Sequence, residues 1–331
     1  MDSQVNTIIL RIFMLSILGL IGYIAGKTKY LPDSSGIYLS RVVIKVTAPI
    51  LIFTTMASRK FTRTEVQNGL CISVFALIFI LISFSISVML CRSLKLEGAV
   101  SNVYKMHMMF GNVVFLAFPL YDSLFGKNSI AIIYAIFFNL ANDTILWTLG
   151  IYLVNKHNSK QWKENLKHLV NGNTIAFALG LLTIVFNLQG LVSKYPAVKS
   201  VYNIIYETLN PLGNTTIYLS MLFIGLILSD VKFDGISDFL KRIPIFILSF
   251  FKLLLMPFIA LIVLSLFGEV INSFVKTIVV LQMAMPCATI VPALAVQYDS
   301  DYKFATETVF ISTLLGAFTL PLMVVLIKIF G

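Results

Sequence analysis

Ten long apolar runs dominate this sequence of 331 residues and limit the folds that it can adopt. Each run holds about 20 residues, the length that an α-helix needs to cross roughly 30 Å of hydrocarbon. Because lipid offers no hydrogen-bond partners, a spanning segment must satisfy its backbone internally, so each run is predicted to be helical. The sequence is therefore typical of an all-α integral membrane protein. The ten predicted spans are residues 7–26, 37–58, 70–91, 102–125, 129–154, 173–191, 203–229, 243–267, 271–296 and 304–329.

The excess of basic residues fits a membrane protein better than a nucleic-acid-binding protein. The formal net charge is +10, but the sequence has no cluster of Lys and Arg with interleaved aromatic residues. The odd-numbered loops carry more Lys and Arg than the even-numbered loops, although Arg59, Lys60 and Arg63 oppose this trend. Since basic residues favour cytoplasmic loops, we expect a multi-pass protein of the cytoplasmic membrane with both termini outside. The three cysteines form no CxxC spacing, and we expect neither a metal site nor a cofactor.

A polar stretch in the middle of the chain divides the ten predicted spans into two sets of five. We place the first five-helix repeat at residues 1–155, the connecting loop at 156–172 and the second repeat at 173–331. Because five is an odd number, the second half must enter the membrane from the opposite side, so any repeat is inverted. The second span of each half also has a central proline, Pro49 or Pro211.

Two predicted spans contain residues that interrupt a helix, and each is the fourth span of its half. The ninth span contains Pro286 and Pro292, which remove two backbone donors and clash with the preceding turns. The fourth span contains Gly111 and Asn112, followed by Pro119. In lipid, an opened helix survives only where protein, water or a ligand covers its polar backbone. Two unrelated kinks are the alternative, but matched interruptions point to the binding site of a transporter.

The fifth and eighth predicted spans carry polar groups that are costly inside a membrane. Asn139 and Asp143 share one helix face with Asn142 beside them, because residues four apart are neighbours on a helix. This patch could carry a proton, bind a cation or brace the broken helix by hydrogen bonds. Lys252 lies in the middle of its span, where it pairs with an acid or a substrate carboxylate, or else extends to the interface.

Other features lie near the ends of the predicted spans. We interpret Lys45, Glu207 and Glu307 as solvated side chains, since water is within their reach at the membrane interface. Gly22 and Gly26 form a GxxxG pair in the first span, and such pairs allow two helices to approach closely.

A membrane enzyme is one alternative to a transporter. Asp230, Asp234 and Asp238 are spaced like half of the metal-diphosphate site of a membrane prenyltransferase. That chemistry needs a second acidic cluster, which the sequence lacks, so a polar loop is the simpler interpretation. A channel or sensor that uses the same fold is a further alternative.

Several motifs in and around the interrupted spans carry a family resemblance. They are Met285 to Thr289, Ala295 to Asp299, Ser312 to Leu315, Leu320 to Leu322, Gly111 to Phe115, Phe118 to Leu120, Phe125 with Gly126, Val46 to Phe53 and Leu222 to Gly225. With these motifs the sequence resembles the auxin efflux carrier family in its bacterial branch. The resemblance extends from Thr7 to Ile329.

The resemblance implies a ten-helix inverted-repeat fold, related to the sodium/bile acid symporters, in which the fourth and ninth helices cross at their breaks. It further implies a scaffold of helices one, two, six and seven that can form a homodimer, and a transport domain made of the other six. Substrates in the family are organic anions such as auxin, malate or malonate. The crossover asparagine of helix four corresponds to Asn112, whereas Ile290 stands where bacterial members often have asparagine.

We therefore expect a secondary transporter, and not an enzyme, that moves a small organic anion through the lipid bilayer by alternating access, without a nucleic-acid partner. The free N–H groups and positive dipole ends of two half-helices attract a carboxylate without an arginine. The predicted substrate-binding residues are Gly111, Asn112, Val113, Cys287, Ala288, Thr289, Ile290 and Val291. The predicted helix-breaking residues are Pro119, Pro286 and Pro292, and those predicted for polar support or proton coupling are Asn139, Asn142, Asp143 and Lys252.

Overall fold

The secondary-structure elements of the described part of the chain are all helices, which confirms the predicted all-α class for these residues. In the computed structural model they are residues 14, 17–58, 61–126, 129–155, 170–230 and 242–330, and they contain no β-strand. After a first helix at Ile17–Lys27, the elements are α2 (Ser35–Val42), η1 (Val43–Thr47), α3 (Ala48–Ala57), α4 (Arg63–Ser93), α5 (Gly98–Met109), α6 (Ala117–Phe125), α7 (Ile130–Ile145), η2 (Leu146–Gly150), α8 (Ile151–Val154), α10 (Gly172–Val185), α11 (Leu188–Lys194), α12 (Pro196–Asp230), α14 (Ile243–Phe250), η4 (Phe251–Leu255), α15 (Met256–Ser265), η5 (Gly268–Val270), α16 (Ser273–Met283), α17 (Ile290–Gln297) and α18 (Tyr302–Phe330).

Among the described residues, six helices are long and apolar enough to cross a membrane, and the bent pair α10 and α11, which meet at 54°, would make a seventh. The six are Ser35–Ala57, Arg63–Ser93, Ile130–Val154, Pro196–Ser229, Ile243–Ser265 and Tyr302–Ile329. The first helix and α16 are apolar but shorter. Residues 7–13 of the first predicted span, and 156–169 of the predicted connecting loop, lie outside the described residues, as do Asp234 and Asp238. Helix length therefore accounts for six or seven of the ten predicted spans.

The helix α4 begins at Arg63, before the apolar run that predicted it, because a capping box fixes its start. The Glu65 N–H donates to the Thr62 hydroxyl at 3.2 Å, and the Thr62 N–H donates to the Glu65 carboxylate at 2.8 Å. These bonds satisfy two backbone donors that a helix start otherwise leaves unpaired.

Three of the long helices contain a wider π-helical turn, and two of these turns precede a proline. The turn η1 comes just before Pro49, and η4 comes just before Pro257, each in the first two positions of the next helix. Proline cannot donate to the turn before it and clashes with that turn's carbonyl group, so a locally wider turn accommodates it. The helices thus continue through these prolines.

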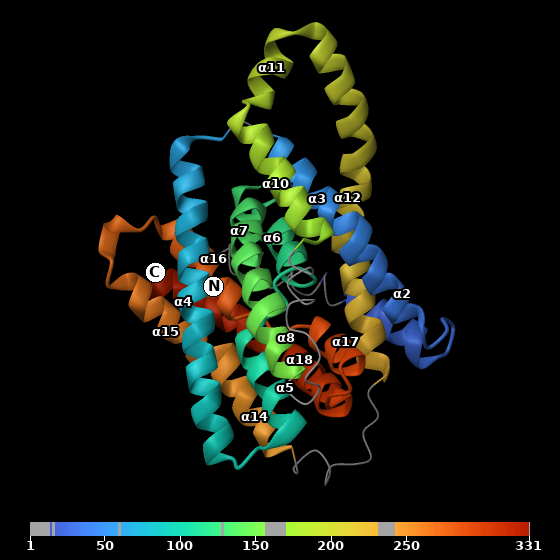
Figure 1. The fold of residues 1–331 in the computed structure, drawn as a ribbon, viewed down its shortest axis with the longest axis vertical. Coiled ribbons are helices and arrows are strands. Elements are labelled where there is room, and N and C mark those ends of the chain that lie inside the picture. Colours follow the sequence, from blue (N-terminus) through green and yellow to red (C-terminus); the bar gives the residue numbers. More distant parts are fainter. Residues whose placement is uncertain are drawn as a thin grey trace.

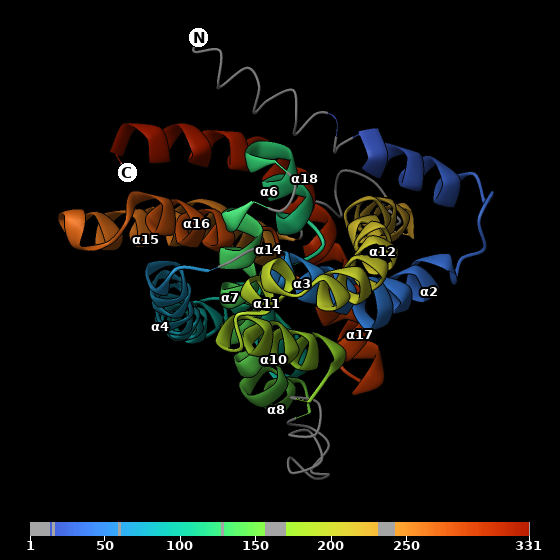
Figure 2. The same cartoon turned by 90° about the horizontal axis from the view of Figure 1, so that it is seen from above.

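The long helices α4 and α12 run lengthwise, with α6, α7 and α10 between them, whereas α15 and α2 lie outside this pair (Figure 1). The helix α3 packs against both α10 and α12, and the view from above shows the same neighbours (Figure 2). The largest buried cluster takes side chains from α3 to α7 and from α15, α16 and α18. The interrupted pair α5 and α6 and the helix α16 therefore lie in the interior of the fold, and one side of α17 packs in a second buried cluster.

The first helix approaches α12 closely along a row of glycines. A Cβ atom on Gly225 would lie 2.6 Å from the Tyr23 nitrogen and still closer to the Gly19 carbonyl oxygen, so only glycine fits. A Cβ on Gly22 or Gly26 would likewise collide with α12. Small residues allow this approach, which adds van der Waals contact where lipid supplies no hydrophobic driving force. The close contact favoured by the GxxxG pair is present.

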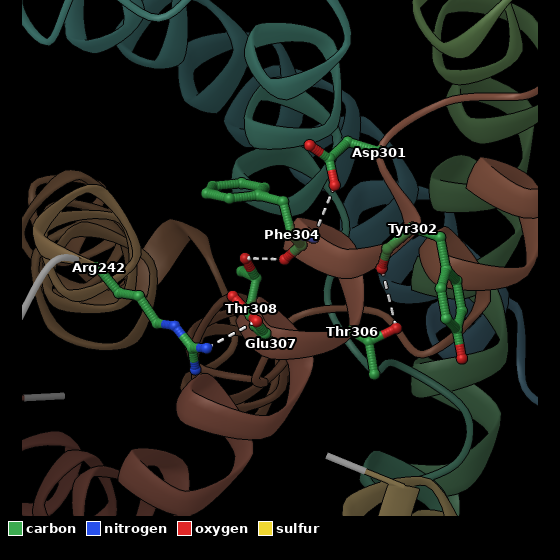
Figure 3. A network of polar contacts seen from close by, with 7 residues as sticks. All are labelled: Arg242, Asp301, Tyr302, Phe304, Thr306, Glu307 and Thr308. Carbon is green, nitrogen blue, oxygen red and sulfur yellow. Dashed lines mark hydrogen bonds and ion pairs between the residues drawn. The ribbon is translucent and has the colours of Figure 1, made fainter. Parts of the chain in front are cut away.

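A polar network ties the start of α14 to the start of α18 (Figure 3). The Arg242 guanidinium lies 2.7 Å from the Glu307 carboxylate, and both side chains are largely buried. Nearby, Asp301 accepts a hydrogen bond from the Phe304 N–H at 2.8 Å and so caps the first turn of α18. Glu307 is therefore not a solvated side chain, because α14 supplies the charge that allows it to be buried.

Candidate functional site

The two interruptions lie side by side and pair with each other. The chain leaves helical structure between α5 and α6 and again between α16 and α17. Gly111 and Cys287 form an isolated antiparallel β-bridge. The Asn112 N–H donates to the Pro286 carbonyl at 2.7 Å. The Ala288 N–H donates to the Phe110 carbonyl at 3.1 Å. Backbone groups released by each break are thus partly satisfied by the other break, as a buried opened helix requires.

Glycine and proline make this close pairing possible. A Cβ atom on Gly111 would lie 3.2 Å from the Met285 Cβ and 3.3 Å from its carbonyl oxygen, so a side chain there would press on the second break. Pro286 lies within that break, where it has no N–H to leave unpaired. Pro119 and Pro292 each occupy the third position of the following helix, α6 or α17, where a missing N–H costs little. Of the three prolines, Pro286 is therefore the one inside an interruption.

Side chains from neighbouring helices hold the ends of the breaks. The Lys252 ammonium, which is 1% exposed, donates to the Met108 carbonyl at 3.2 Å and the Met109 carbonyl at 3.3 Å. It thereby satisfies the last carbonyls of α5 and meets the negative end of that helix dipole. The Cys287 N–H donates to the Ser312 hydroxyl of α18 at 3.1 Å. Lys252 supports the break in this way and does not reach the cavity beside it.

A further bond links the two broken spans. The Tyr121 hydroxyl of α6 donates to the Ile278 carbonyl of α16 at 3.3 Å, and both residues are fully buried. Neither Tyr121 nor Ser312 is among the site residues predicted from the sequence. Their hydroxyl groups next to the interrupted segments were the only available signal, since any buried hydroxyl needs a partner.

A cavity of about 470 Å³ borders the paired breaks on one side. This volume lies within the range of small-molecule sites. It is enclosed by η1 and α3, the first break, α7 and η2, the start of α10 and the second break. Its lining consists of Ile44, Lys45, Ala48, Gly111, Asn112, Val113, Val114, Phe115, Asn139, Asn142, Asp143, Leu146, Trp147, Val170, Asn171, Gly172, Asn173, Ala288, Thr289 and Ile290.

Buried polar atoms on this cavity have no hydrogen-bond partner among the described residues. Both polar atoms of the Asn112 side chain are unpaired, and so are the Thr289 hydroxyl and the side-chain oxygens of Asn139 and Asn142. These four residues are only 2 to 4% exposed. Buried polar groups nearly always have partners, so unpaired ones in residues that line a cavity are suited to a polar ligand or to ordered water.

Two charged residues also line the cavity. Asp143 accepts a hydrogen bond from the Asn139 side-chain amide at 3.2 Å, which joins the predicted polar patch to the cavity wall. Lys45 lines it from η1 and has an exposed side chain. The position of Lys45 near the end of its span predicts a solvated side chain at the interface, whereas the cavity that it lines is formed by segments distant in the sequence.

Six of the eight predicted substrate-binding residues line the cavity. They are Gly111, Asn112, Val113, Ala288, Thr289 and Ile290. Cys287 and Val291 do not line it, and their side chains have no exposed surface. Cys287 sits in the extended break, where successive side chains point to opposite sides, and Val291 lies on the inward face of α17. Both residues are packed behind the residues that line the cavity.

No group of three or more His, Cys, Asp or Glu residues that could hold a metal ion occurs within the described ranges. The cavity presents amide, hydroxyl and backbone groups together with one carboxyl and one ammonium group. Such a set can bind and orient a polar solute.

Comparison with known proteins agrees with a role in transport. The sequence profile of the family described as "Membrane transport protein" matches residues 7–324. An uncharacterized transporter of Methanocaldococcus jannaschii is 24% identical over 305 residues, which cover 91% of this chain and 93% of the relative. Another, from Methanothermobacter thermautotrophicus, is 25% identical over 308 residues, covering 92% and 94%. The chain therefore belongs to the membrane transport protein family that includes the auxin efflux carriers.

Proposed function

We propose that this protein is a secondary transporter that carries a small organic anion, such as malate, malonate or an auxin-like carboxylate, across the cytoplasmic membrane. One observation carries the proposal. Two broken spans meet at a cavity that Asn112 and Thr289 line, and both residues hold buried side-chain polar atoms without protein partners. Matched interrupted helices at the centre of a membrane fold are characteristic of transporter substrate sites.

The helix ends at the crossing suit an anion. The helix α17 begins directly after the second break, and α6 begins after a turn at residues 113–116 that follows the first break. The N–H groups of Ala117 and Phe118 already donate to the Asn112 and Val114 carbonyls, so the start of α6 acts on an anion through its dipole. The dipoles of both helices place partial positive charge at these ends, which favours a carboxylate. The Asn112 amide adds a side-chain donor from the first break, and Thr289 adds a hydroxyl from the second. A carboxylate can thus be bound without an arginine in the cavity.

The proposal includes the ten-span inverted repeat. In each half the fourth span is the one divided at the crossing, as α5 with α6 and as α16 with α17, if the first helix and α16 belong to spans that cross the membrane. The first helix, α2 with α3, α10 with α11, and α12 then form the scaffold, and the other six spans form the transport domain. Both termini lie outside, and the scaffold pairs in a homodimer, a state that light scattering of the purified protein would measure.

Alternating access follows from the position of the cavity between these two units. Lys45, Ala48 and Asn173 come from scaffold elements, whereas Asn112 and Thr289 come from the transport domain. If the transport domain shifts against the scaffold, the two crossed breaks lose contact with one set of scaffold residues and gain contact with another. The anion is thereby exposed first to one side of the membrane and then to the other.

A counterflow assay tests the proposal. We expect purified protein in liposomes preloaded with an unlabelled mono- or dicarboxylate to accumulate the same labelled anion transiently, with a rate that saturates at high concentration. Empty liposomes and preloading with an unrelated neutral sugar serve as controls. A channel would give flux without counterflow, and an enzyme would alter the anion chemically. Absence of counterflow with every carboxylate in the panel would refute the assignment.

Asp143 is proposed as the group that couples transport to protons. It is the carboxyl group of the cavity lining, and Lys45 is the other charged residue there. We expect the initial rate of uptake by wild-type protein to differ between mildly acidic and mildly basic pH. Asp143→Asn should remove this pH dependence while keeping the hydrogen bond with Asn139. The measurement is the initial rate of counterflow across this pH range. A pH dependence that survives in Asp143→Asn would leave Asp143 only its supporting contact with Asn139.

A further inference from the structure

Two residues of opposite charge hold equivalent positions in the two halves. Lys45 lies four residues before Pro49, and Glu207 lies four residues before Pro211. Both prolines belong to helices that continue past them, α3 and α12. Both side chains are exposed, and neither forms an ion pair with another described residue.

The helices that carry these charges cross at equivalent residues. A Cβ atom on Gly213 would lie 2.9 Å from the Leu51 nitrogen and 3.0 Å from its Cα, which makes this a backbone-to-backbone contact. Leu51 and Gly213 each lie two residues after their proline. The same register on both sides is what a local two-fold relation between the two segments produces.

The two charges therefore lie on opposite sides of this crossing. In Figure 1, α12 descends from its connection with α11, while the chain rises from α2 through α3 towards α4. Lys45 and Glu207 each precede the contact by six residues, or about 9 Å at the helical rise. Because the segments run in opposite directions, Lys45 is displaced to one side and Glu207 to the other.

Only Lys45 borders the cavity in this conformation. It lies where α10 begins, since a Cβ on Gly172 would be 3.1 Å from Pro49 and 3.9 Å from the Lys45 carbonyl oxygen. Glu207 does not line that cavity. In an inverted repeat, the conformation that opens to the other side would bring the equivalent residues of α12 to the entrance.

We infer that Lys45 and Glu207 give the two entrances opposite charge, so that the carrier binds its anion more tightly from the Lys45 side than from the Glu207 side. This inference rests on the proposed function. A cation at the mouth of a low-dielectric cleft concentrates anions there, and an acid at the opposite mouth repels them. A carrier cannot shift the equilibrium across the membrane, so the difference in half-saturation is offset by a difference in turnover between the two directions.

The test measures half-saturation separately on each face of the membrane. Right-side-out and inside-out vesicles receive labelled malonate, or the carboxylate with the fastest counterflow if malonate is not carried. The proposed topology puts residue 303 on the Lys45 side of the membrane. Labelling of Lys303→Cys by an impermeant thiol reagent therefore identifies which face of each vesicle is outermost. We expect wild-type half-saturation to be about threefold lower on the Lys45 side, the scale of one screened charge near the site.

Three variants and two controls isolate the charges. Lys45→Met should raise half-saturation about threefold on its own side only, and Glu207→Gln should lower it on the other side. Exchanging the charges, with Lys45→Glu and Glu207→Lys together, should reverse the asymmetry. Lys303→Met and Glu269→Gln make the same charge changes at exposed positions away from the cavity and should have no effect.

Two results would overturn the inference, and they are distinguishable. Counterflow with equal half-saturation on both faces, unchanged in the exchanged variant, would refute the charge asymmetry and leave the transporter assignment intact. Absence of counterflow for every carboxylate would refute both. Should the exchanged variant fail to fold, the two single neutral variants still decide the question.

Discussion

Replacing Asn112 by alanine is expected to raise the half-saturation concentration of the carried anion by about tenfold or more. The Asn112 side chain is 2% exposed, lines the cavity and has both polar atoms unpaired in the protein. A hydrogen bond to a charged ligand in a desolvated site contributes about 1.5 to 3 kcal/mol, which corresponds to roughly tenfold or more in affinity. The measurement is counterflow in liposomes as a function of anion concentration.

Two further substitutions make this expectation specific to the amide donor. Asn112→Asp keeps the size of the side chain but removes the donor and adds negative charge, so it should bind the anion more weakly than Asn112→Ala. Asn203→Ala makes the matched change on α12 at a residue that does not line the cavity, and it should behave like wild type. Normal saturation in Asn112→Ala would place the anion elsewhere.

Replacing Gly225 by alanine is expected to destabilise the protein severely, whereas alanine at Gly19 in the same interface should be tolerated. A Cβ on Gly225 would lie 2.6 Å from the Tyr23 nitrogen and 2.9 Å from the Gly19 carbonyl carbon. A Cβ on Gly19 would be 3.9 Å from the Met221 oxygen, an ordinary contact. Overpacking costs about 1 to 3 kcal/mol, and here the obstacle is backbone, which cannot rotate away. The first helix must therefore move off α12.

The melting temperature of the purified variants in detergent measures this difference. We expect a fall of about 5 °C or more for Gly225→Ala and little change for Gly19→Ala. Because both changes add one methyl group, a difference between them reports the close approach and not helix propensity. Equal melting temperatures would mean that the two helices are further apart than the structure indicates.

Hydropathy predicted the long helices because a membrane span depends on the composition of one continuous segment. The predicted span 129–154 agrees closely with α7 through α8, at Ile130–Val154. The start of α4 was missed because its capping box, at Thr62 and Glu65, is polar and lies before the apolar run. The interruptions were foreseen from Gly111 and Pro286, since glycine and proline act on the local backbone.

The direction in which side chains point was the part that the sequence could not supply. Cys287 and Val291 belong to the second interrupted span, but the direction of their side chains is set by the extended break and by the packing of α17. The position of Glu307 near a span end predicts a solvated side chain, yet Arg242 of another helix allows it to be buried. Lys45 borders the cavity only because α10 begins beside it. Each outcome depends on contacts between segments that are distant in the chain.

The bonds at the crossing have a consequence for how the protein is made. Lys252, which satisfies the end of α5, is encoded far downstream of it, and Tyr121 satisfies a carbonyl group in α16. During synthesis the first interrupted span must therefore enter the bilayer before its stabilising partners exist. Its unpaired backbone groups gain their partners only after the later half of the polypeptide has been made. Insertion of the two halves and formation of the crossing are therefore separate events in biogenesis.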